Sequence, residues 1–311
     1  MSGETTDQNP LSVEAQFVPD EEIVSTQTPL PRSSIKLERE TFKTLFNLTD
    51  KQPWLKENQQ ALAELIDECA DHEQQILICE LLYRFTFLDA NDFSASIQSI
   101  SDFIQNDLNL NGENCYIAAA DDTKYSDSSQ LVAYSLKAAK WNAHDWNTTA
   151  FVSGLKNLPA LPFRENIVLV DEFVGTGETA EKQIHWIKKQ LAAVGASSKI
   201  YFASVAAMEV GIARLSPSVD GIFSAHILRK GITDFYPVDE AIANIGTMKT
   251  IEKTLGEMGR RGKLKKHTLG YKKSEALYSR SNGNTPNNVF PIFWWETRRD
   301  SAMRKTILRC I

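Results

Sequence analysis

The chain has 311 residues and a formal net charge of −6, and its 42% hydrophobic and 24% charged residues are ordinary for a globular protein. No apolar run approaches the roughly 18 residues that a membrane span needs, and the first residues show no signal-peptide pattern. The cysteines at 69, 79, 115 and 310 have no CxxC spacing, which argues against a zinc site or a disulfide framework. We therefore expect a cytoplasmic protein that does not bind membranes.

The two ends of the chain carry opposite charge. Residues 1–110 contain 7 Lys and Arg against 20 Asp and Glu, a net charge of −13, whereas residues 251–311 contain 14 against 5, a net charge of +9. One interpretation is that a polyanion binds the C-terminal end. The alternative is that the two ends neutralise one another within the fold.

The first third of the chain divides into two segments. Residues 1–35 are rich in Thr, Ser, Gln, Pro and acids, and we expect a disordered leader because they can bury little apolar surface. Residues 36–110 have the apolar spacing of amphipathic helices, which predicts a small helical unit. The residues with this spacing are Leu62, Leu65, Ile66 and Cys69, then Ile76, Cys79, Leu82 and Phe85, and finally Ile97, Ile100 and Ile104.

Residues 111–235 alternate between short apolar runs and helical patterns, which predicts an α/β core with a parallel sheet. The run at 167–170 is wholly apolar, as is typical of a strand buried on both faces. Residues 236–311 are expected to form a helix over about 238–258 and then a basic C-terminal cap. The other expected strands lie at 115–120, 201–206 and 222–227. Helices are expected at 127–139 and 208–215, and a further helix follows the glycine loop and ends at about Val194.

The segment that follows the buried run at 167–170 has the pattern of a phosphate site. Two carboxylates, Asp171 and Glu172, come first, and a loop with two glycines and two threonines then opens a helix. Backbone N–H groups at a helix start bind phosphate, and glycine lets the backbone approach a ligand closely. Acids next to such a loop suit a sugar phosphate. The alternative is a sharp strand–helix turn with solvated acids.

Other phosphate motifs fit this segment less well. The loop has no lysine, which excludes the GxxxxGK[ST] motif. It also lacks a third glycine, and its acids precede the loop, so it is not a dinucleotide-binding fingerprint.

Residues 167–179 resemble the phosphoribosyl-pyrophosphate (PRPP) motif of type I phosphoribosyltransferases, and weaker similarity extends over about 111–228. The resemblance implies the parallel sheet of that fold, with the helical unit before it and the basic cap after it. It gives Asp171 and Glu172 the catalytic role of holding the ribose hydroxyls. It gives the binding of the ribosyl 5′-phosphate to Gly175, Thr176, Gly177, Glu178 and Thr179.

The same resemblance implies a pyrophosphate loop and Mg²⁺ carried by the substrate. The matching positions are Lys124, Ser126, Ser128 and Ser129, although the glycine pair usual in this loop is absent. The second acid is Glu172 where Asp is more usual, and Gly175 stands where purine-type enzymes have an acid facing the base. Ordinary salvage of a nucleobase is therefore less expected.

A second resemblance covers residues 270–277 and 284–295, which are similar to the tail of ribosyltransferase and DNA-binding effectors of bacterial anti-phage retrons. It implies a toxic effector that partners a reverse transcriptase and its RNA–DNA product, the msDNA. The alternative is a catalytically inactive sensor that binds PRPP or a nucleotide, or a DNA-binding regulatory module.

The C-terminal third contains further candidates. Polar and aromatic residues suit contact with a base or acceptor, although core packing is the commoner fate of Trp. The basic run suits nucleic-acid phosphates, or is simply a solvated helix end. The histidines have no metal-ligand spacing, so no protein-built metal site is expected. The candidates are Tyr271, Asn287, Asn288 and Trp294 for the base or acceptor, and Arg260, Arg261, Lys263, Lys265 and Lys266 for nucleic acid.

Overall fold

The computed structural model describes residues 39–121, 128–142 and 146–310. The expected leader at 1–35 and the loop positions Lys124 and Ser126 lie outside the described residues. No helix in the described ranges is long and apolar enough to cross a bilayer.

A five-stranded, all-parallel sheet forms the core, which confirms the expected α/β class. Its spatial order is β3-β2-β4-β5-β6, so β4, the strand that carries the acids, is central. In the register of the three middle strands, Val168 of β4 lies beside Ile117 of β2 on one side and Tyr201 of β5 on the other. The strands are β2 (Cys115–Ala119), β3 (Phe151–Val152), β4 (Asn166–Val174), β5 (Lys199–Met208) and β6 (Gly221–Leu228).

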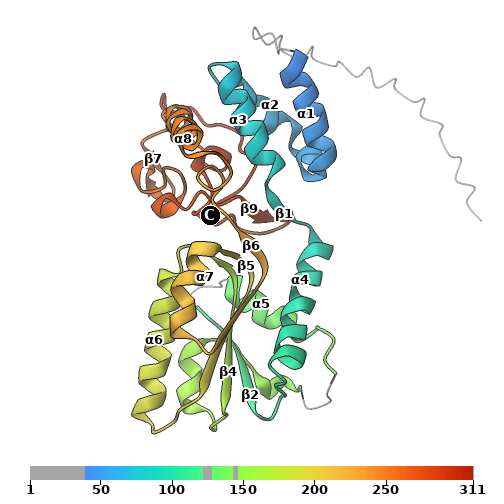
Figure 1. Ribbon diagram of the computed structural model, residues 1–311, viewed down its shortest axis with the longest axis vertical. Helices are drawn as coiled ribbons and strands as arrows, with labels where there is room; N and C mark the ends of the chain where they lie inside the picture. The colour runs from blue at the N-terminus through green and yellow to red at the C-terminus, as the bar shows by residue number, and fades with distance from the viewer. Residues whose placement is uncertain (1–38, 122–127, 143–145, 311) are drawn as a thin grey trace, which may run out of the picture. The chain divides into compact units, whose positions relative to one another are not determined.

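Helices cover both faces of the sheet (Figure 1). Val168 and Val170 of β4 pack with apolar residues of α4 (Ala90–Asp102) and α5 (Ser128–Leu136). Ile167 and Leu169 point the other way, into a cluster with residues of α6 (Glu178–Ala193) and α7 (Glu209–Leu215). This two-sided burial explains why the strand reads as a continuous apolar run.

The helical segment before the sheet consists of α1 (Arg39–Lys51), α2 (Gln59–Asp67) and α3 (His72–Tyr83). Asp71 caps α3 by accepting a hydrogen bond from the backbone N–H of Gln74. Helix α4, which the sequence pattern groups with this segment, packs instead on β5 and β6 of the sheet. Its apolar residues Ile97 and Ile100 are buried there.

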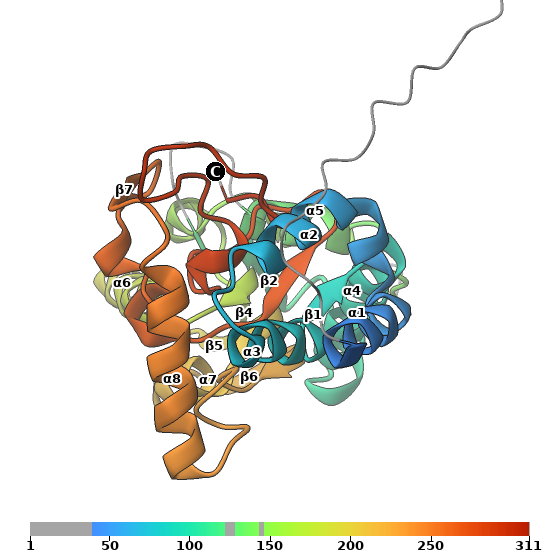
Figure 2. The same ribbon diagram turned by 90° about the horizontal axis from the view of Figure 1, so that it is seen from above.

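The C-terminal cap begins with α8 (Val238–Glu252), which packs against α3 (Figures 1 and 2). The helix expected to reach residue 258 therefore ends six residues earlier. After it, Leu255 forms an antiparallel bridge with Arg298, and a Cβ on Gly256 would stand 2.7 Å from the Thr297 hydroxyl oxygen. This packing against the end of the chain stops the helix. The hairpin of β7 (Met258–Gly259) and β8 (Gly262–Lys263) follows.

One strand pairing ties the helical segment to the cap, and nothing in the sequence pattern predicts it. Strand β1 (Thr86–Leu88) pairs in parallel with β9 (Tyr278–Arg280), and paired residues are 192 positions apart in the sequence. Short helical turns complete the fold at Pro53–Asn58, Phe103–Asp107, Thr148–Ala150, Leu155–Ala160, Ser216–Ser218, Leu264–Lys266, Tyr271–Lys273 and Pro291–Phe293.

Candidate functional site

The loop between β4 and α6 has the geometry that its sequence predicts. Strand β4 runs through both acids to Val174, further than the apolar run alone indicates, and α6 begins at Glu178. Gly177, the N-cap of α6, has a φ of +75°, a left-handed conformation that favours glycine. The first N–H groups of this 16-residue helix have no acceptor within the helix and can stabilise an anion, and the first three residues of α6 line the cavity described below.

Neighbouring segments approach this loop so closely that side chains would not fit. A Cβ on Gly211, in the first turn of α7, would stand 2.5 Å from the Gly175 carbonyl oxygen. A Cβ on Gly175 would in turn stand 2.4 Å from two side-chain atoms of Asn288. The loop is therefore fixed between α7 on one side and the cap on the other.

A cavity of about 380 Å³ lies over this loop. It brings together residues that are far apart in the sequence: one acid, the loop and the helix start, and three polar residues of the cap. Its lining consists of Asp171, Phe173, Val174, Gly175, Thr176, Gly177, Glu178, Thr179, Ala180, Tyr271, Asn287 and Asn288.

The two acids of the motif lie in different surroundings. Asp171 is half-buried, lines the cavity, and accepts a hydrogen bond of 2.7 Å at Oδ1 from the Glu172 backbone N–H. Glu172 is 2% exposed and is not among the lining residues. Successive side chains of a strand point to opposite faces, which explains the separation. Of the two acids, Asp171 is therefore the one that lines the cavity.

Glu172 takes part in a buried ion pair. Its Oε2 lies 2.9 Å from Nε of Arg280, which comes from β9, and both side chains are almost fully buried. The Arg280 guanidinium also lies 4.9 Å from the ring centroid of Phe93 in α4. Burial and the negative charge of Glu172 raise the pKa of Tyr278, whose ring stacks on Phe173. Glu172 thus joins the sheet, α4 and the cap behind the cavity.

Glu178, at the first position of α6, lies between two cations. Arg214 of α7 is 3.1 Å away, and Lys272 of the cap also contacts the carboxylate. Hydrogen bonds from Lys272 and Arg214 lower the pKa of Glu178 below its ordinary value. Two positive charges therefore stand beside the Gly175–Thr179 loop, and the Glu178 carboxylate contacts both.

Lys272 reaches this position from a loop with an unusual backbone. Leu269, Lys272, Lys273 and Glu275 all have φ between +51° and +59°, a conformation that costs a non-glycine residue about 1–2 kcal/mol. Several buried carboxylate contacts hold the segment. Both oxygens of Glu252 accept the Leu269 N–H at 3.0 and 3.2 Å. The loop is therefore held in a strained shape beside the cavity, as is common at functional sites.

Glu275 and Asn288 fix the other end of the loop. The Glu275 carboxylate accepts hydrogen bonds from the backbone N–H groups of Ile232 and Thr233 and from the Thr233 hydroxyl. The Asn288 side chain donates to Ser274 Oγ at 3.1 Å. The asparagine amide that touches Gly175 is thus itself held in place.

Trp294, Ser128 and Ser129 are not among the lining residues of the cavity. Trp294 is buried, and its indole N–H donates to the Val289 carbonyl at 2.9 Å, so it packs in the cap core. Ser128 and Ser129 open α5, and Ser129 Oγ accepts the Asp121 N–H at 3.3 Å. Neither serine lines the cavity.

The cationic residues of the cap fall into two groups. Arg298 and Arg304 both bind Glu68 of the helical segment, with the Nε atoms 3.0 Å from its Oε1. Arg260 pairs with Glu296 at 3.0 Å. The contacts with Glu68 fit the interpretation that the acidic front and the basic tail neutralise one another, whereas the pair of Arg260 and Glu296 lies within the tail. Lys263 and Lys265 instead line a second cavity, described below.

Sequence reasoning did not single out Arg214, Arg280 or Lys272. Arg214 lies one helical turn after Gly211, the glycine that packs on the loop. No pattern in the sequence marks Arg214 as a site residue. Lys272 and Arg280 belong to the basic C-terminal segment, 251–311. In such a segment, positive charge alone does not distinguish a site residue from a solvated one.

The central acid-bearing strand, the glycine loop at the helix start and the five-stranded parallel sheet define a phosphoribosyltransferase-like α/β protein. The sequence matches the PRTase-CE family over residues 57–304, and the chain belongs to that family. The match covers the sheet, most of the helical segment and nearly all of the cap. A search of curated proteins finds no match to the chain.

Proposed function

We propose that the cavity binds a ribosyl 5′-phosphate donor, PRPP or a close relative. The observation that carries the proposal is the placement of Asp171 beside the Gly175–Thr179 loop in one cavity. The phosphate accepts hydrogen bonds from the N–H groups at the start of α6, and Arg214 and Lys272 add positive charge. The Asp171 carboxylate accepts hydrogen bonds from the ribose hydroxyls.

The same arrangement supports transfer of the ribosyl group. The bond between C1 and the leaving pyrophosphate breaks as positive charge develops on the sugar, and an acceptor then bonds to C1. Asp171 orients the sugar, and its carboxylate stabilises that charge. Mg²⁺ carried by the pyrophosphate would neutralise the charge of the leaving group, and the Asp171 carboxylate is the oxygen ligand that the cavity would offer it. The polar cap residues Tyr271, Asn287 and Asn288 face the acceptor side.

Calorimetry with PRPP and with ribose 5-phosphate tests the binding. Asp171→Asn keeps the Oδ1 acceptor for the Glu172 N–H but removes the charge, so affinity should fall while the fold persists. Asp239→Asn, which removes an exposed acid in the first turn of α8, is the matched control and should bind normally. Equal affinity of wild type and Asp171→Asn would contradict the proposed site.

The proposed biological role is that of a toxic effector in a retron anti-phage system, acting in the cytoplasm. Its support is the similarity of residues 270–277 and 284–295 to such effectors, and those residues include the cap side of the cavity. The reverse transcriptase and its msDNA then hold the effector inactive until a phage disturbs them. Expression of the chain without these partners should arrest growth, and Asp171→Asn should relieve the arrest. Unrelieved arrest at equal expression would refute the role of this site.

The second candidate is a sensor that binds the donor without transferring it. Two features favour it: Gly175 leaves no acid to exchange a proton with a base, and the Glu178 carboxylate offsets one of the two positive charges of Arg214 and Lys272. Prolonged incubation with PRPP, Mg²⁺ and mixed nucleobases or nucleotides, followed by mass spectrometry, distinguishes the two. Release of pyrophosphate and a ribosylated product indicates the transferase, whereas binding without either indicates the sensor.

A further inference from the structure

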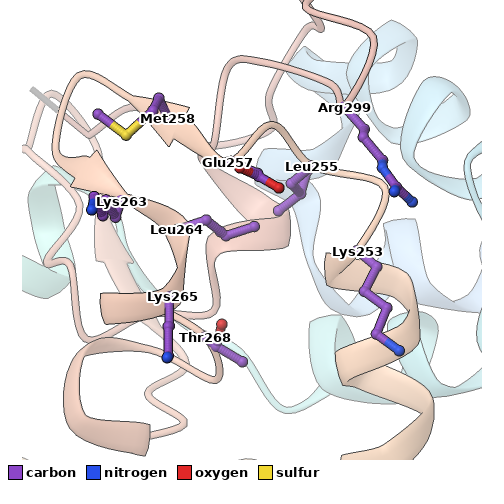
Figure 3. Close-up of a pocket in the computed structure, with 9 residues that line it drawn as sticks. All are labelled: Lys253, Leu255, Glu257, Met258, Lys263, Leu264, Lys265, Thr268 and Arg299. Atoms are coloured by element: carbon purple, nitrogen blue, oxygen red, sulfur yellow. The ribbon is translucent and has the colours of Figure 1, made fainter.

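A second cavity lies in the C-terminal cap, between the end of α8 and the β7–β8 hairpin (Figure 3). Its volume is about 590 Å³, within the range of small-molecule sites. It shares no lining residue with the cavity at the phosphate loop. We call it the hairpin pocket, and its lining consists of Lys253, Leu255, Glu257, Met258, Lys263, Leu264, Lys265, Thr268 and Arg299.

Four cations and one carboxylate line the hairpin pocket, an excess of three positive charges. Figure 3 shows Lys253 and Arg299 on one side and Lys263 and Lys265 on the other. Elsewhere in the cap, Arg260, Arg298 and Arg304 have carboxylate partners. Across the described residues, the four pocket cations have no such ion pair. Positive charge without internal partners, gathered around a hollow, attracts an anion.

The centre of the hairpin pocket contains two leucines and one carboxylate, that of Glu257. Leu255 and Leu264 lie between the two pairs of cations, and the flexible, exposed Met258 stands at the hairpin (Figure 3). Glu257 and the Thr268 hydroxyl supply an acceptor and a donor. A ligand that fits has both an anionic group and a flat or apolar body with polar edges. A nucleotide has these properties, whereas inorganic phosphate would leave the apolar surface uncovered.

The frame of the hairpin pocket is already formed. Leu264 donates its N–H to the Glu257 carbonyl at 2.9 Å, and Arg299 donates its N–H to the Thr254 carbonyl at 2.8 Å. A Cβ on Gly259 would stand 2.7 Å from the Trp295 ring, so the hairpin packs directly on the cap core. A ligand therefore needs to order only the cationic side chains, which lowers the entropic cost of binding.

We propose that the hairpin pocket binds a nucleotide, with its phosphates against the lysine and arginine side chains that line the pocket and its base against Leu264 and Met258. Free nucleotides and the terminal nucleotide of a nucleic-acid strand share this chemistry. Of the basic run singled out in the sequence, this assigns Lys263 and Lys265 to the ligand and leaves Arg260 to its partner Glu296.

Titration of the full chain with ADP and with a 5′-phosphorylated hexadeoxynucleotide tests this proposal. Saturating ribose 5-phosphate is present throughout, so that the phosphate loop does not compete for the probe. The variant combines Lys263→Glu with Lys265→Glu. The matched control combines Lys188→Glu with Lys189→Glu, which makes the same change of charge at exposed positions of α6. A second variant, Lys253→Gln with Arg299→Gln, probes the opposite side.

We expect the hairpin variant to weaken binding about tenfold or more, the Lys253 and Arg299 variant to weaken it, and the α6 control to change it little. Tighter binding of ADP would identify a free nucleotide as the source, and tighter binding of the oligonucleotide would identify a strand end. Equal weakening in the hairpin variant and the α6 control would show general attraction by charge and overturn the proposal. Absence of binding of both probes to the unmodified chain would also overturn it. Ribose 5-phosphate affinity, measured separately, reports on the phosphate loop and is not expected to change.

Discussion

The side-chain amide of Asn288 occupies the space into which a Cβ on Gly175 would project, with Cγ and Nδ2 each 2.4 Å from that position. Gly175 is the position at which purine-type relatives are expected to carry an acid. The cap thus places a neutral amide against the loop at this position. The phosphate loop and the cap are complementary at this contact, although 113 residues separate them.

This contact predicts a measurable coupling between the two residues. Gly175→Ala forces the Asn288 amide away from Ser274, and we expect it to lower the free energy of unfolding by about 1–3 kcal/mol. Asn288→Ala removes the obstructing atoms, so the double variant should be more stable than the sum of the single effects predicts. Urea denaturation of the four proteins measures the coupling. Strictly additive effects would contradict the interlocked geometry.

The sheet could be predicted from sequence because its signals are local. The apolar run at 167–170 indicates burial on both faces, and the glycines after it indicate a turn onto a helix start. The lining of the cavity was anticipated in part: Asp171, the loop and three cap residues do lie together. The separation of Asp171 from Glu172 follows from strand alternation, once β4 is known to extend past them.

What local pattern could not predict depends on distant partners. The parallel pairing of β1 with β9, the bond between Glu68 and Arg304, and the contact of Lys272 with Glu178 join segments 94 to 236 residues apart. A single sequence contains no signal for the partner of a given charge. The end of α8 was misplaced for the same reason, because the cap and not local propensity stops it at Glu252.

The buried ion pair of Glu172 and Arg280 predicts that the two motif acids have different effects on stability. Glu172→Gln leaves the Arg280 charge buried without its partner, and we expect a loss of about 3–5 kcal/mol in the free energy of unfolding. Combining it with Arg280→Met should restore part of that loss. Asp171→Asn should change stability by less than about 1 kcal/mol, because Asp171 lines a cavity.

Chemical denaturation of these three variants provides the measurement. If Glu172→Gln were as stable as the unmodified chain while ligand binding was lost, Glu172 would act in the cavity and not behind it. That outcome would also restore to Glu172 the ribose-binding role that the sequence motif predicts.

The carboxylate of Glu178 predicts an effect on phosphate affinity. It holds Arg214 and Lys272, so Glu178→Gln should free both cations and strengthen ribose 5-phosphate binding about twofold to fivefold. Lys272→Met should weaken it. Glu181→Gln is the matched control, since that acid lies one turn on and is 4.0 Å from Arg214. The difference should shrink as salt rises from 0.05 to about 0.5 M, because screening weakens exposed charge pairs. Weaker binding by Glu178→Gln would mean that Glu178 itself contacts the ligand.

The last prediction concerns pH and Glu252, which holds the strained loop by accepting the Leu269 N–H. Burial raises the pKa of Glu252 from an ordinary value of 4.5 to about 8. Between these values the folded chain keeps a proton that the unfolded chain releases, so the free energy of unfolding falls as pH rises, by at most about 1.4 kcal/mol per pH unit. The loss of stability begins near pH 4.5 and is complete above pH 8.

Glu252→Gln keeps an acceptor for the Leu269 N–H and removes the titration. The stability of the unmodified chain relative to Glu252→Gln should therefore decline from pH 5 to pH 9, as measured by urea denaturation at each pH. A difference that stays constant over this range would show that Glu252 titrates alike in the folded and unfolded chain.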